Sequence, residues 1–512
     1  MILEIFKENP QLVNEIRQGI ERECLRVDEY GEISKNEHHK NLGSKLTHPN
    51  ITTDYSENLL EFITNVHHDT SSLLKELNSL HAFTQNNIEN EFFWNSSMPA
   101  RLSGNDLEIP LAYYGNSNVG KLKTLYRMGL GHRYGRSMQV ISGVHYNFSL
   151  SDSFWNKLKI NQNSDLSIQE LKSQNYFSLV RNFNRYKSLL TYLFGSTSAV
   201  DKSFLVGKKH NLEKLTEDTY YTPTGTSLRM GGLGYTSNAQ KSITVCYDYI
   251  ETYVKTLEAA RLRSMPEYEK IGLSDEFGLK QLNTNLLQID NEYYSTIRPK
   301  NIARSRESAL MALHKRGVEY IEVRLLDVDF NSEVGITSSQ IDFLHMFLLF
   351  CLTEDSPMIS EAECQELNEN FESIVLKGRS SDTKLFLNGK SSSISDYYLR
   401  LFDKMEALAG LFSEKNPEYL KAIKDQRLKI ENPDLLPSNI LLDKIGTIGF
   451  HKFHLSQSRE LKSRYHLSKE EEESLSKLAL QSWVDQKDVE ARDKLPFNEF
   501  LIQYFKDIKL DF

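Results

Sequence analysis

The chain has 512 residues, with 61 Lys and Arg against 70 Asp and Glu, so its formal net charge is −9. Hydrophobic residues make up 39% and charged residues 26%, which is the balance of an ordinary globular protein. This length can bury a large core without disulfide or metal staples. The acidic balance argues against a nucleic-acid-binding protein, which normally carries a basic face. An anionic substrate stays compatible with it, because metal ions can mediate the contact.

Cysteine usage and apolar runs bear on the compartment. The N-terminal run Met1–Glu8 contains acids, so it does not resemble a signal peptide. The longest apolar stretch, 343–352, is ten residues long and too short to cross a bilayer. The cysteines are too few and too scattered for a disulfide framework, and no CxxC occurs: they are Cys24, Cys246, Cys351 and Cys364. We therefore expect a cytoplasmic protein with no membrane and no nucleic-acid partner.

No fixed-period repeat and no Pro/Gly/Ser linker divides the chain. The polar segments 151–173 and 377–395 are interpreted as excursions rather than domain boundaries. We expect one α+β unit over residues 1–512, with a core sheet at about 15–330 and a helical C-terminal part at about 335–512.

Several predicted strands carry polar residues at alternate positions, where a buried face would be apolar. Because side chains alternate along a strand, each pair shares one side. Such strands predict an antiparallel sheet with one apolar face and one face lining a wet cavity, since a parallel sheet normally buries both faces. The strands and their polar pairs are 19–27 with Glu21 and Glu23, 142–148 with His145 and Asn147, 282–289 with Asn283 and Asn285, and 320–325 with Glu322 and Arg324.

Helices are clearest in the last third. Residues 338–352 have a broad apolar face, and 396–412 are amphipathic. Ser468 and Glu471 form a capping box that opens a helix running towards Val484. The acidic run 470–473 is interpreted as a solvated first turn, which the helix dipole favours.

The segment 54–61 carries three acids. If it opens a helix, Asp54, Glu57 and Glu61 fall at i, i+3 and i+7 on one face. A strand would separate them instead. Such a face is ordinarily solvated surface, but hard oxygen ligands are also what Mg²⁺ binds.

Each remaining signal has a structural alternative. Glu21 and Glu23 project in parallel and repel each other, unless they lie on a solvated edge screened by Arg22 and Arg26. His145, between apolar neighbours, could be a hydrogen-bonded core histidine, and Glu322 with Arg324 could be a cross-strand ion pair. Together these residues indicate a site for two or three metal ions with a cation placed to meet phosphate.

Missing motifs narrow the chemistry. The sequence has no P-loop, no HExxH and no GxSxG, and the Gly-rich segment 230–235 is not a Rossmann fingerprint. Metal-type carboxylates with arginines and no P-loop are compatible with ATP-dependent carboxylate activation.

Longer motifs point to a family. The chain resembles glutamate–cysteine ligase (γ-glutamylcysteine synthetase) of the proteobacterial type, through stretches spread in order over residues 19 to about 330. They are 20–23 (IERE), 46–48 and 51–54, 60–64 (LEFIT), 124–127 (TLYR), 141–150 (ISGVHYNFSL), 226–229 (TSLR), 297–300 (IRPK) and 317–324 (GVEYIEVR).

The resemblance implies a glutamine-synthetase-like fold, with a curved, mostly antiparallel sheet forming a funnel-shaped active site surrounded by helices. It implies ATP-dependent ligation of the L-glutamate γ-carboxylate to the L-cysteine amine through γ-glutamyl phosphate, giving γ-glutamylcysteine, ADP and phosphate. This is the first step of glutathione biosynthesis. The resemblance further implies Mg²⁺, with Mn²⁺ as an alternative, and feedback inhibition by glutathione, which contains the product. We expect a monomer.

Residue roles carried over from the family follow its motifs. Arg324 and Arg127 are expected to be catalytic, with Arg324 on the transferring phosphate and Arg127 clamping a phosphate or substrate carboxylate. Arg229 is expected to be a second clamp, with Tyr126, Tyr235 and Tyr294 as walls of the cysteine pocket. The expected metal ligands are Glu21, Glu23, Asp54, Glu61, His145 and Glu322.

Three positions depart from the family pattern. Cys24 replaces Thr and is expected to be buried on the far side of its strand. Asp290 replaces Glu near Tyr294, and Tyr55 adds a hydroxyl close to the expected metal helix. The last two put substrate affinity in doubt, not the reaction class.

Three rival functions stay open. The chain could ligate glutamate to another amine, act as a metal-dependent hydrolase, or bind glutamate without catalysis.

Overall fold

The computed structural model describes residues 2–234, 239–304 and 307–510. Its centre is a seven-stranded sheet in the order β11-β12-β5-β1-β3-β2, with β4 pairing beside β1, and every pairing is antiparallel. The predicted α+β class with an antiparallel sheet is confirmed. The strands are β1 (Arg17–Val27), β2 (Ile51–Thr53), β3 (Leu59–Ile63), β4 (Phe92–Phe93), β5 (Val144–Ser149), β11 (Ile297–Lys300) and β12 (Tyr320–Leu326).

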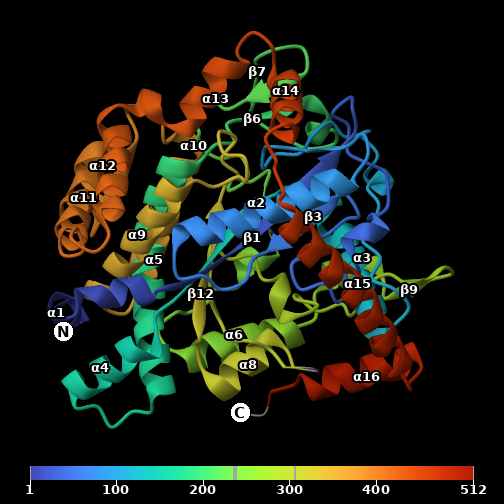
Figure 1. The fold of residues 1–512 in the computed structure, drawn as a ribbon, viewed down its shortest axis with the longest axis horizontal. Helices are drawn as coiled ribbons and strands as arrows, with labels where there is room; N and C mark the ends of the chain where they lie inside the picture. The colour runs from blue at the N-terminus through green and yellow to red at the C-terminus, as the bar shows by residue number, and fades with distance from the viewer. Residues whose placement is uncertain (1, 235–238, 305–306, 511–512) are drawn as a thin grey trace.

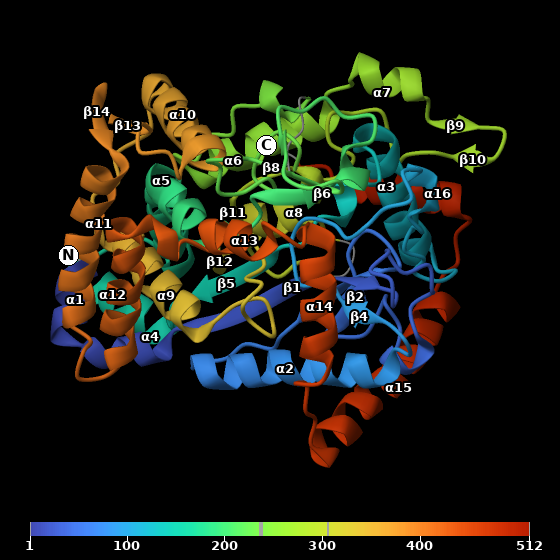
Figure 2. The ribbon, with the colours of Figure 1, turned by 90° about the horizontal axis from the view of Figure 1, so that it is seen from above.

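One face of this sheet is apolar and forms part of the main core. Ile20, Phe62, Tyr146 and Val323 are fully buried in it. Their alternate neighbours point the other way, because successive side chains on a strand lie on opposite faces. Three helices contribute to the same core, namely α2 (Thr70–Asn87), α5 (Ile168–Phe194) and α9 (Ser338–Thr353), and Figure 2 shows α2 running along the sheet beside β1. Because the apolar face is buried in the core, the opposite, polar face of the sheet is the one that can form a functional site.

The C-terminal third is helical, as predicted, apart from one hairpin. The predicted helices at 338–352 and 396–412 are α9 and α11, and Ser468 and Glu471 form the predicted capping box of α15. In Figure 1, α11 and α12 lie at one side of the molecule, and α15 and α16 extend across the opposite side. These helices are α10 (Glu361–Lys377), α11 (Ile394–Gly410), α12 (Pro417–Glu431), α13 (Pro437–Ile445), α14 (Phe450–Lys462), α15 (Lys469–Ala491) and α16 (Phe497–Asp507).

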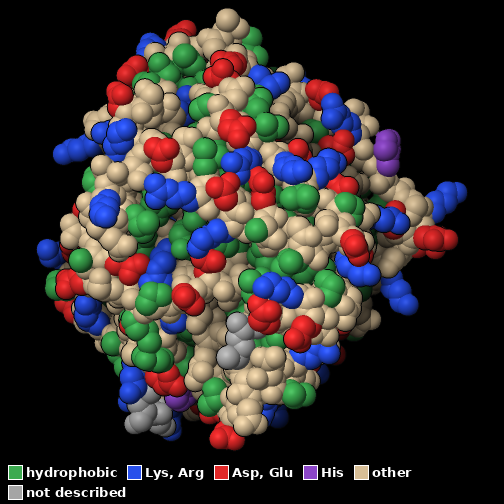
Figure 3. Space-filling view, turned by 90° about the vertical axis from the view of Figure 1, so that its left-hand side faces the viewer, with side chains coloured by type: hydrophobic (Ala, Val, Ile, Leu, Met, Phe, Trp, Pro, Cys, Tyr) green, Lys and Arg blue, Asp and Glu red, His purple; other side chains and the backbone are tan. Residues whose placement is uncertain are grey.

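The other elements surround the sheet. Acidic and basic side chains are interspersed over the face shown in Figure 3. No helix in the described ranges is long and apolar enough to cross a membrane. The remaining elements are α1 (Ile2–Glu8), α3 (Asn118–Tyr134), α4 (Asp152–Gln162), α6 (Ile250–Leu262), α7 (Pro266–Ile271) and α8 (Ala309–Arg316), with the strands β6 (Ala199–Asp201), β7 (Glu213–Lys214), β8 (Thr219–Tyr221), β9 (Ser274–Asp275), β10 (Gly278–Leu279), β13 (Lys384–Leu387) and β14 (Lys390–Ser393).

Two segments differ from the helix and the strand considered for them. Residues 54–61 form no helix: 54–58 are the turn between β2 and β3, where the Asp54 amide donates to the Leu59 carbonyl at 3.0 Å, and 59–61 begin β3. The alternative of a strand therefore holds for Glu61. Residues 282–289 form no strand, because side chains occupy the local backbone groups. Asn283 accepts from the Asn285 amide at 3.0 Å, and Arg133 donates to the carbonyls of both asparagines.

Candidate active site

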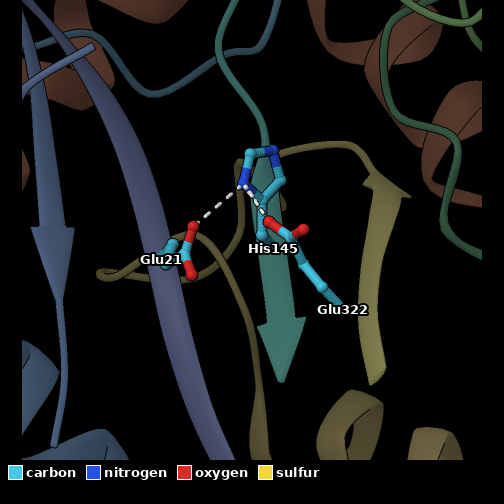
Figure 4. Close-up of side chains that lie close together, drawn as sticks. All are labelled: Glu21, His145 and Glu322. Atoms are coloured by element: carbon cyan, nitrogen blue, oxygen red, sulfur yellow. Dashed lines mark ion pairs between the residues drawn. The ribbon is translucent and has the colours of Figure 1, made fainter. Parts of the chain in front are cut away.

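Strand pairing brings the predicted acids together on the polar face. Glu21 of β1 lies opposite His145 of β5, and Glu23 lies opposite Glu61 of β3. Residues directly opposite each other on antiparallel strands share a face. Figure 4 shows Glu21, His145 and Glu322 projecting from three different strands towards one another.

His145 is at the centre of this cluster. Its Nδ1 lies 3.6 Å from an oxygen of Glu21 and 3.6 Å from one of Glu322, and its Nε2 lies 3.5 Å from Glu23. Burial and the nearby Arg324 lower the pKa of His145 to about 4, so the ring is neutral at pH 7 and these contacts are not ion pairs there. Within the described residues neither ring nitrogen has a hydrogen-bond partner.

Donor atoms of Glu21, His145 and Glu322 all lie within 4.8 Å of one another. A neutral imidazole and two carboxylates at this spacing can hold a metal ion. The unpartnered ring nitrogens fit that use, since a buried polar atom normally has a partner.

The other acids of the cluster resist ionisation together. Burial and the charge of Asp54 raise the pKa of Glu23 to about 8. Burial, with repulsion from Asp54 and Glu21, raises the pKa of Glu61 well above its ordinary value, and burial likewise raises the pKa of Asp54. Carboxylates that crowd in this way require a cation or protons.

Glu57, the weaker candidate, lies outside the cluster. Its carboxylate pairs with Lys45 and accepts from the amides of Tyr113 at 2.7 Å and His38 at 3.0 Å. The turn between β2 and β3 separates it from Glu61, because the segment is not the helix that would have aligned them.

Glu322 is paired with two cations. Arg324 Nη1 lies 2.7 Å from one oxygen, and Lys300 Nζ lies 3.2 Å from the other. Burial would raise the pKa of Glu322, but Arg324 and Lys300 outweigh it and hold the pKa well below the ordinary range. The predicted Glu322–Arg324 ion pair is present, although within one strand rather than across two. Lys300 was not named as a site residue from the sequence. It could have been, because Arg298 and Lys300 lie two apart on β11 and therefore place two cations on one face of the strand.

A cavity adjoins the cluster and shares His145 and Arg324 with it. The rest of its lining comes from Arg229, Met230, Tyr294, Ser295 and Thr296. Polar and cationic groups thus surround a space next to the carboxylates, which suits an anionic or zwitterionic ligand.

Arg229 is buried at the edge of this cavity. Its Nη2 donates to the Arg324 carbonyl at 2.9 Å, and its Nη1 lies 3.9 Å from Asp327. A Cβ on Gly143 would come within 2.1 Å of Nη2, so a larger residue there would displace the Arg229 guanidinium. The Gly143 amide also donates to Glu23 at 2.6 Å. One glycine therefore links the acid cluster to the arginine.

Two of the three tyrosines that are predicted to wall the cysteine pocket lie in the described part of the chain. The Tyr294 hydroxyl accepts from Gln139 at 2.9 Å, and its ring meets Tyr134 edge-on at 5.7 Å. Tyr126 is half-buried on α3 and packs against two hydrophobic clusters. Tyr235 lies outside the described residues.

Arg127 lies on α3 and is engaged with the backbone. It donates to the carbonyls of Asp54 and, at 3.0 Å, Lys123, and its guanidinium stacks over Tyr114 at 4.5 Å. In this state Arg127 fixes the turn that carries Asp54 and does not line the cavity described above.

The chain is similar to known proteins over most of its length. A family model described as glutamate–cysteine ligase matches residues 3–374. The chain belongs to the glutamate–cysteine ligase family. Glutamate–cysteine ligase of Hahella chejuensis is 42% identical over 97% of both chains, and that of Saccharophagus degradans is 43% identical over 98% of this chain and 97% of its own. The chain is thus an enzyme of glutathione synthesis, a ligase that joins glutamate to cysteine.

Solved structures agree with this family. Glutamate–cysteine ligase of Francisella tularensis, in complex with AMP, is similar with a TM-score of 0.91 and 37% identity, covering 96% of this chain and 98% of its own. A bifunctional glutathione synthetase from Pasteurella multocida has a TM-score of 0.72 and 24% identity over 91% of this chain and 55% of its own. The second likeness concerns the fold alone.

The departures from the ligase pattern have structural explanations. Cys24 is fully buried in the main core, as predicted. Asp290 accepts from the Leu310 amide at 2.5 Å in the first turn of α8, so its carboxylate is engaged with that helix. No metal helix lies beside Tyr55, since that segment is a turn. Glu292, not Asp290, reaches the wall, where Tyr134 donates to it at 2.8 Å.

Proposed function

We propose that the polar face of the sheet activates the γ-carboxylate of L-glutamate with Mg²⁺ and ATP, and that L-cysteine occupies the adjoining cavity. The observation that carries this is the convergence of Glu21, His145 and Glu322 beside Arg324, at the border of that cavity. The AMP complex of the Francisella tularensis ligase supports a nucleotide site in a relative of the same fold.

The donor set fits a divalent cation. Carboxylates are hard ligands that suit Mg²⁺, and one imidazole keeps Mn²⁺ as an alternative. When bound, the metal would act as a Lewis acid that offsets negative charge on the phosphates. The residues proposed to hold it are Glu21, Glu23, Asp54, Glu61, His145 and Glu322.

The reaction must convert a poor leaving group into a good one. The γ-carboxylate oxygen attacks the γ-phosphorus of ATP, and the bond to ADP breaks, giving γ-glutamyl phosphate and ADP. Arg324 stabilises the charge on the phosphoryl group as it transfers. The free amine of cysteine then attacks the acyl carbon, and inorganic phosphate leaves from the tetrahedral intermediate while the nitrogen loses its proton.

The cavity side is proposed to hold cysteine. Arg229 lines this cavity and is proposed to clamp a carboxylate or phosphate group, since Arg offers bidentate geometry. Arg127 is proposed as a second clamp outside the cavity, a role in which its guanidinium would have to leave its backbone partners. From the family resemblance, Tyr126, Tyr235 and Tyr294 are the residues proposed to exclude water, which would otherwise hydrolyse the acyl phosphate. Of these, Tyr294 lines the cavity, and Tyr235 lies outside the described residues. We therefore expect glutamate alone to support only weak ATP turnover, measured as ADP release without cysteine. Full-rate turnover in that assay would contradict the gating.

Broader features follow the family resemblance. We propose that the sheet forms a funnel like that of glutamine synthetase and that residues 1–512 act as one catalytic unit. We also propose that the protein is a cytoplasmic monomer. Glutathione is proposed to inhibit it, because glutathione contains the product. Sedimentation and inhibition assays would test the monomer and the inhibition.

The deciding experiment measures ADP release with ATP, glutamate and each candidate amine, together with mass spectrometry of the product. Cysteine should be the preferred acceptor and γ-glutamylcysteine the product. Preference for another amine would show a different ligase. A hydrolase would not need ATP, so the absence of thermal stabilisation by nucleotide would favour that class.

A further inference from the structure

Lys300 has no role in the chemistry proposed above, yet it lies at the acid cluster. It is the last residue of β11, and its Nζ lies 3.2 Å from Glu322. The Lys300 side chain is 20% exposed, whereas that of Glu322 is 0% exposed. The Lys300 side chain therefore reaches the buried carboxylate while part of it stays exposed.

Arg298, two residues before Lys300 on the same face of β11, forms hydrogen bonds away from the acid cluster. Arg298 donates to the carbonyls of Asn291 and Tyr293 and, at 3.3 Å, to Ser295. Those contacts hold the loop that carries Tyr294. Arg298 is therefore a structural anchor for the cavity wall.

Lys300 is less constrained. In residues 2–234, 239–304 and 307–510 its one ion-pair partner is Glu322. A lysine ammonium is a compact charge on a flexible stem, so it can exchange one anionic partner for another.

We propose that Lys300 is a second phosphate-binding cation, which binds the γ-phosphoryl group of ATP together with Arg324. The two cations approach opposite oxygens of Glu322, so an anion that binds beside this carboxylate meets both of them. Without ligand, Lys300 and Arg324 pair with Glu322. With nucleotide bound, their charge is directed to the phosphate. This inference rests on the proposed function.

The test measures the binding of two nucleotides by calorimetry, each in the presence of Mg²⁺. One nucleotide is AMP, and the other is the non-hydrolysable ATP analogue AMPPNP. Lys300→Met should weaken AMPPNP binding about 10- to 100-fold, the usual value of a hydrogen bond to a charged group, and leave AMP binding nearly unchanged. Binding of Mn²⁺ alone should be no weaker, because a competing cation has been removed. Lys300→Arg should retain most of the AMPPNP affinity.

Lys270→Met, at an exposed position on α7, is the matched control and should change none of these affinities. Unchanged AMPPNP binding in Lys300→Met would overturn the inference. So would equal losses for AMP and AMPPNP with weaker Mn²⁺ binding, because Lys300 would then only neutralise Glu322. Failure of the wild-type chain to bind AMPPNP or to form γ-glutamylcysteine would instead overturn the proposed function.

Discussion

Glu322 shows how much a single side chain decides in this site. It is fully buried and paired with Arg324 and Lys300, and it approaches His145 within 3.6 Å. A buried charge of this kind is tolerated only where partners compensate its desolvation. The same carboxylate is thus a proposed metal ligand and also the partner of the two cations that are proposed to meet phosphate.

We expect Glu322→Gln to lower kcat on the order of 10²–10³-fold or more, because the charge that holds the metal and orients Arg324 is lost. Mg²⁺ binding should weaken, and circular dichroism should show an unchanged fold, since Gln has the same shape. Glu276→Gln, in the exposed β9–β10 hairpin, serves as the control. Wild-type turnover in Glu322→Gln would remove this residue from the site.

At the scale of secondary structure, the polar strand face is an assembly of acids that repel one another. Folding raises the pKa of Glu23 from 4.5 to about 8 and raises that of Glu61 well above 4.5. A carboxyl with a raised pKa binds its proton more tightly in the folded state. Its contribution to stability is present below pH 4.5 and is lost as pH rises towards 8.

Metal-free protein should therefore lose stability from Glu23 between pH 4.5 and 8, and Mg²⁺ should raise Tm more at pH 8 than at pH 5. Thermal melts with EDTA or Mg²⁺ across this range provide the measurement. In Glu23→Gln the metal-free melts should depend less on pH. A metal effect on Tm that is equal at both ends of the range would contradict the expectation.

The connection into β5 also positions an element of the cavity. Gly143→Ala places a methyl group against Arg229 and should cost about 1–3 kcal/mol of stability, as overpacking does. We expect KM for cysteine to rise more than KM for ATP, because Arg229 faces the cavity. Gly410→Ala, where nothing lies within 4 Å of the added Cβ, is the control. Wild-type cysteine KM in Gly143→Ala would separate Arg229 from substrate binding.

Across the whole molecule, the C-terminal helices brace parts of the active-site region. Ser482 of α15 accepts from the Ser44 amide at 2.8 Å, and Asp493 accepts from the Asn118 amide at 2.5 Å in the first turn of α3. Helix α3 carries Tyr126 and Arg127. A residue 375 positions downstream in the chain thus holds the start of a helix proposed to bind substrate.

Asp493→Ala should destabilise the enzyme by about 0.5–1 kcal/mol, because α3 loses a negatively charged acceptor at its N-terminus. The measurement is chemical denaturation, with substrate KM values expected to rise modestly. Asp488→Ala, exposed near the end of α15, should leave both unchanged. An unchanged denaturation midpoint in Asp493→Ala would show that α3 does not depend on this contact.

Which side chains share a face of one strand could be predicted from the amino-acid sequence alone. Alternation with a period of two is a local property, so Glu21 with Glu23 and the environment of His145 could be predicted without knowing which strands pair. The family motifs then predicted the reaction and the antiparallel class. The capping box of α15 was equally local, because both of its residues lie within one turn.

Tertiary structure decided what depends on distant partners. The acids of 54–61 fit a helical spacing, but Leu59, Leu60 and Glu61 pair with β1, so this end of the segment is a strand despite the repulsion between Glu61 and Glu23. Asp290 caps α8 and Lys300 meets Glu322, each through a residue about 20 positions away. Such contacts leave no periodic signal in the sequence, because their energy arises only after the chain has brought the partners together.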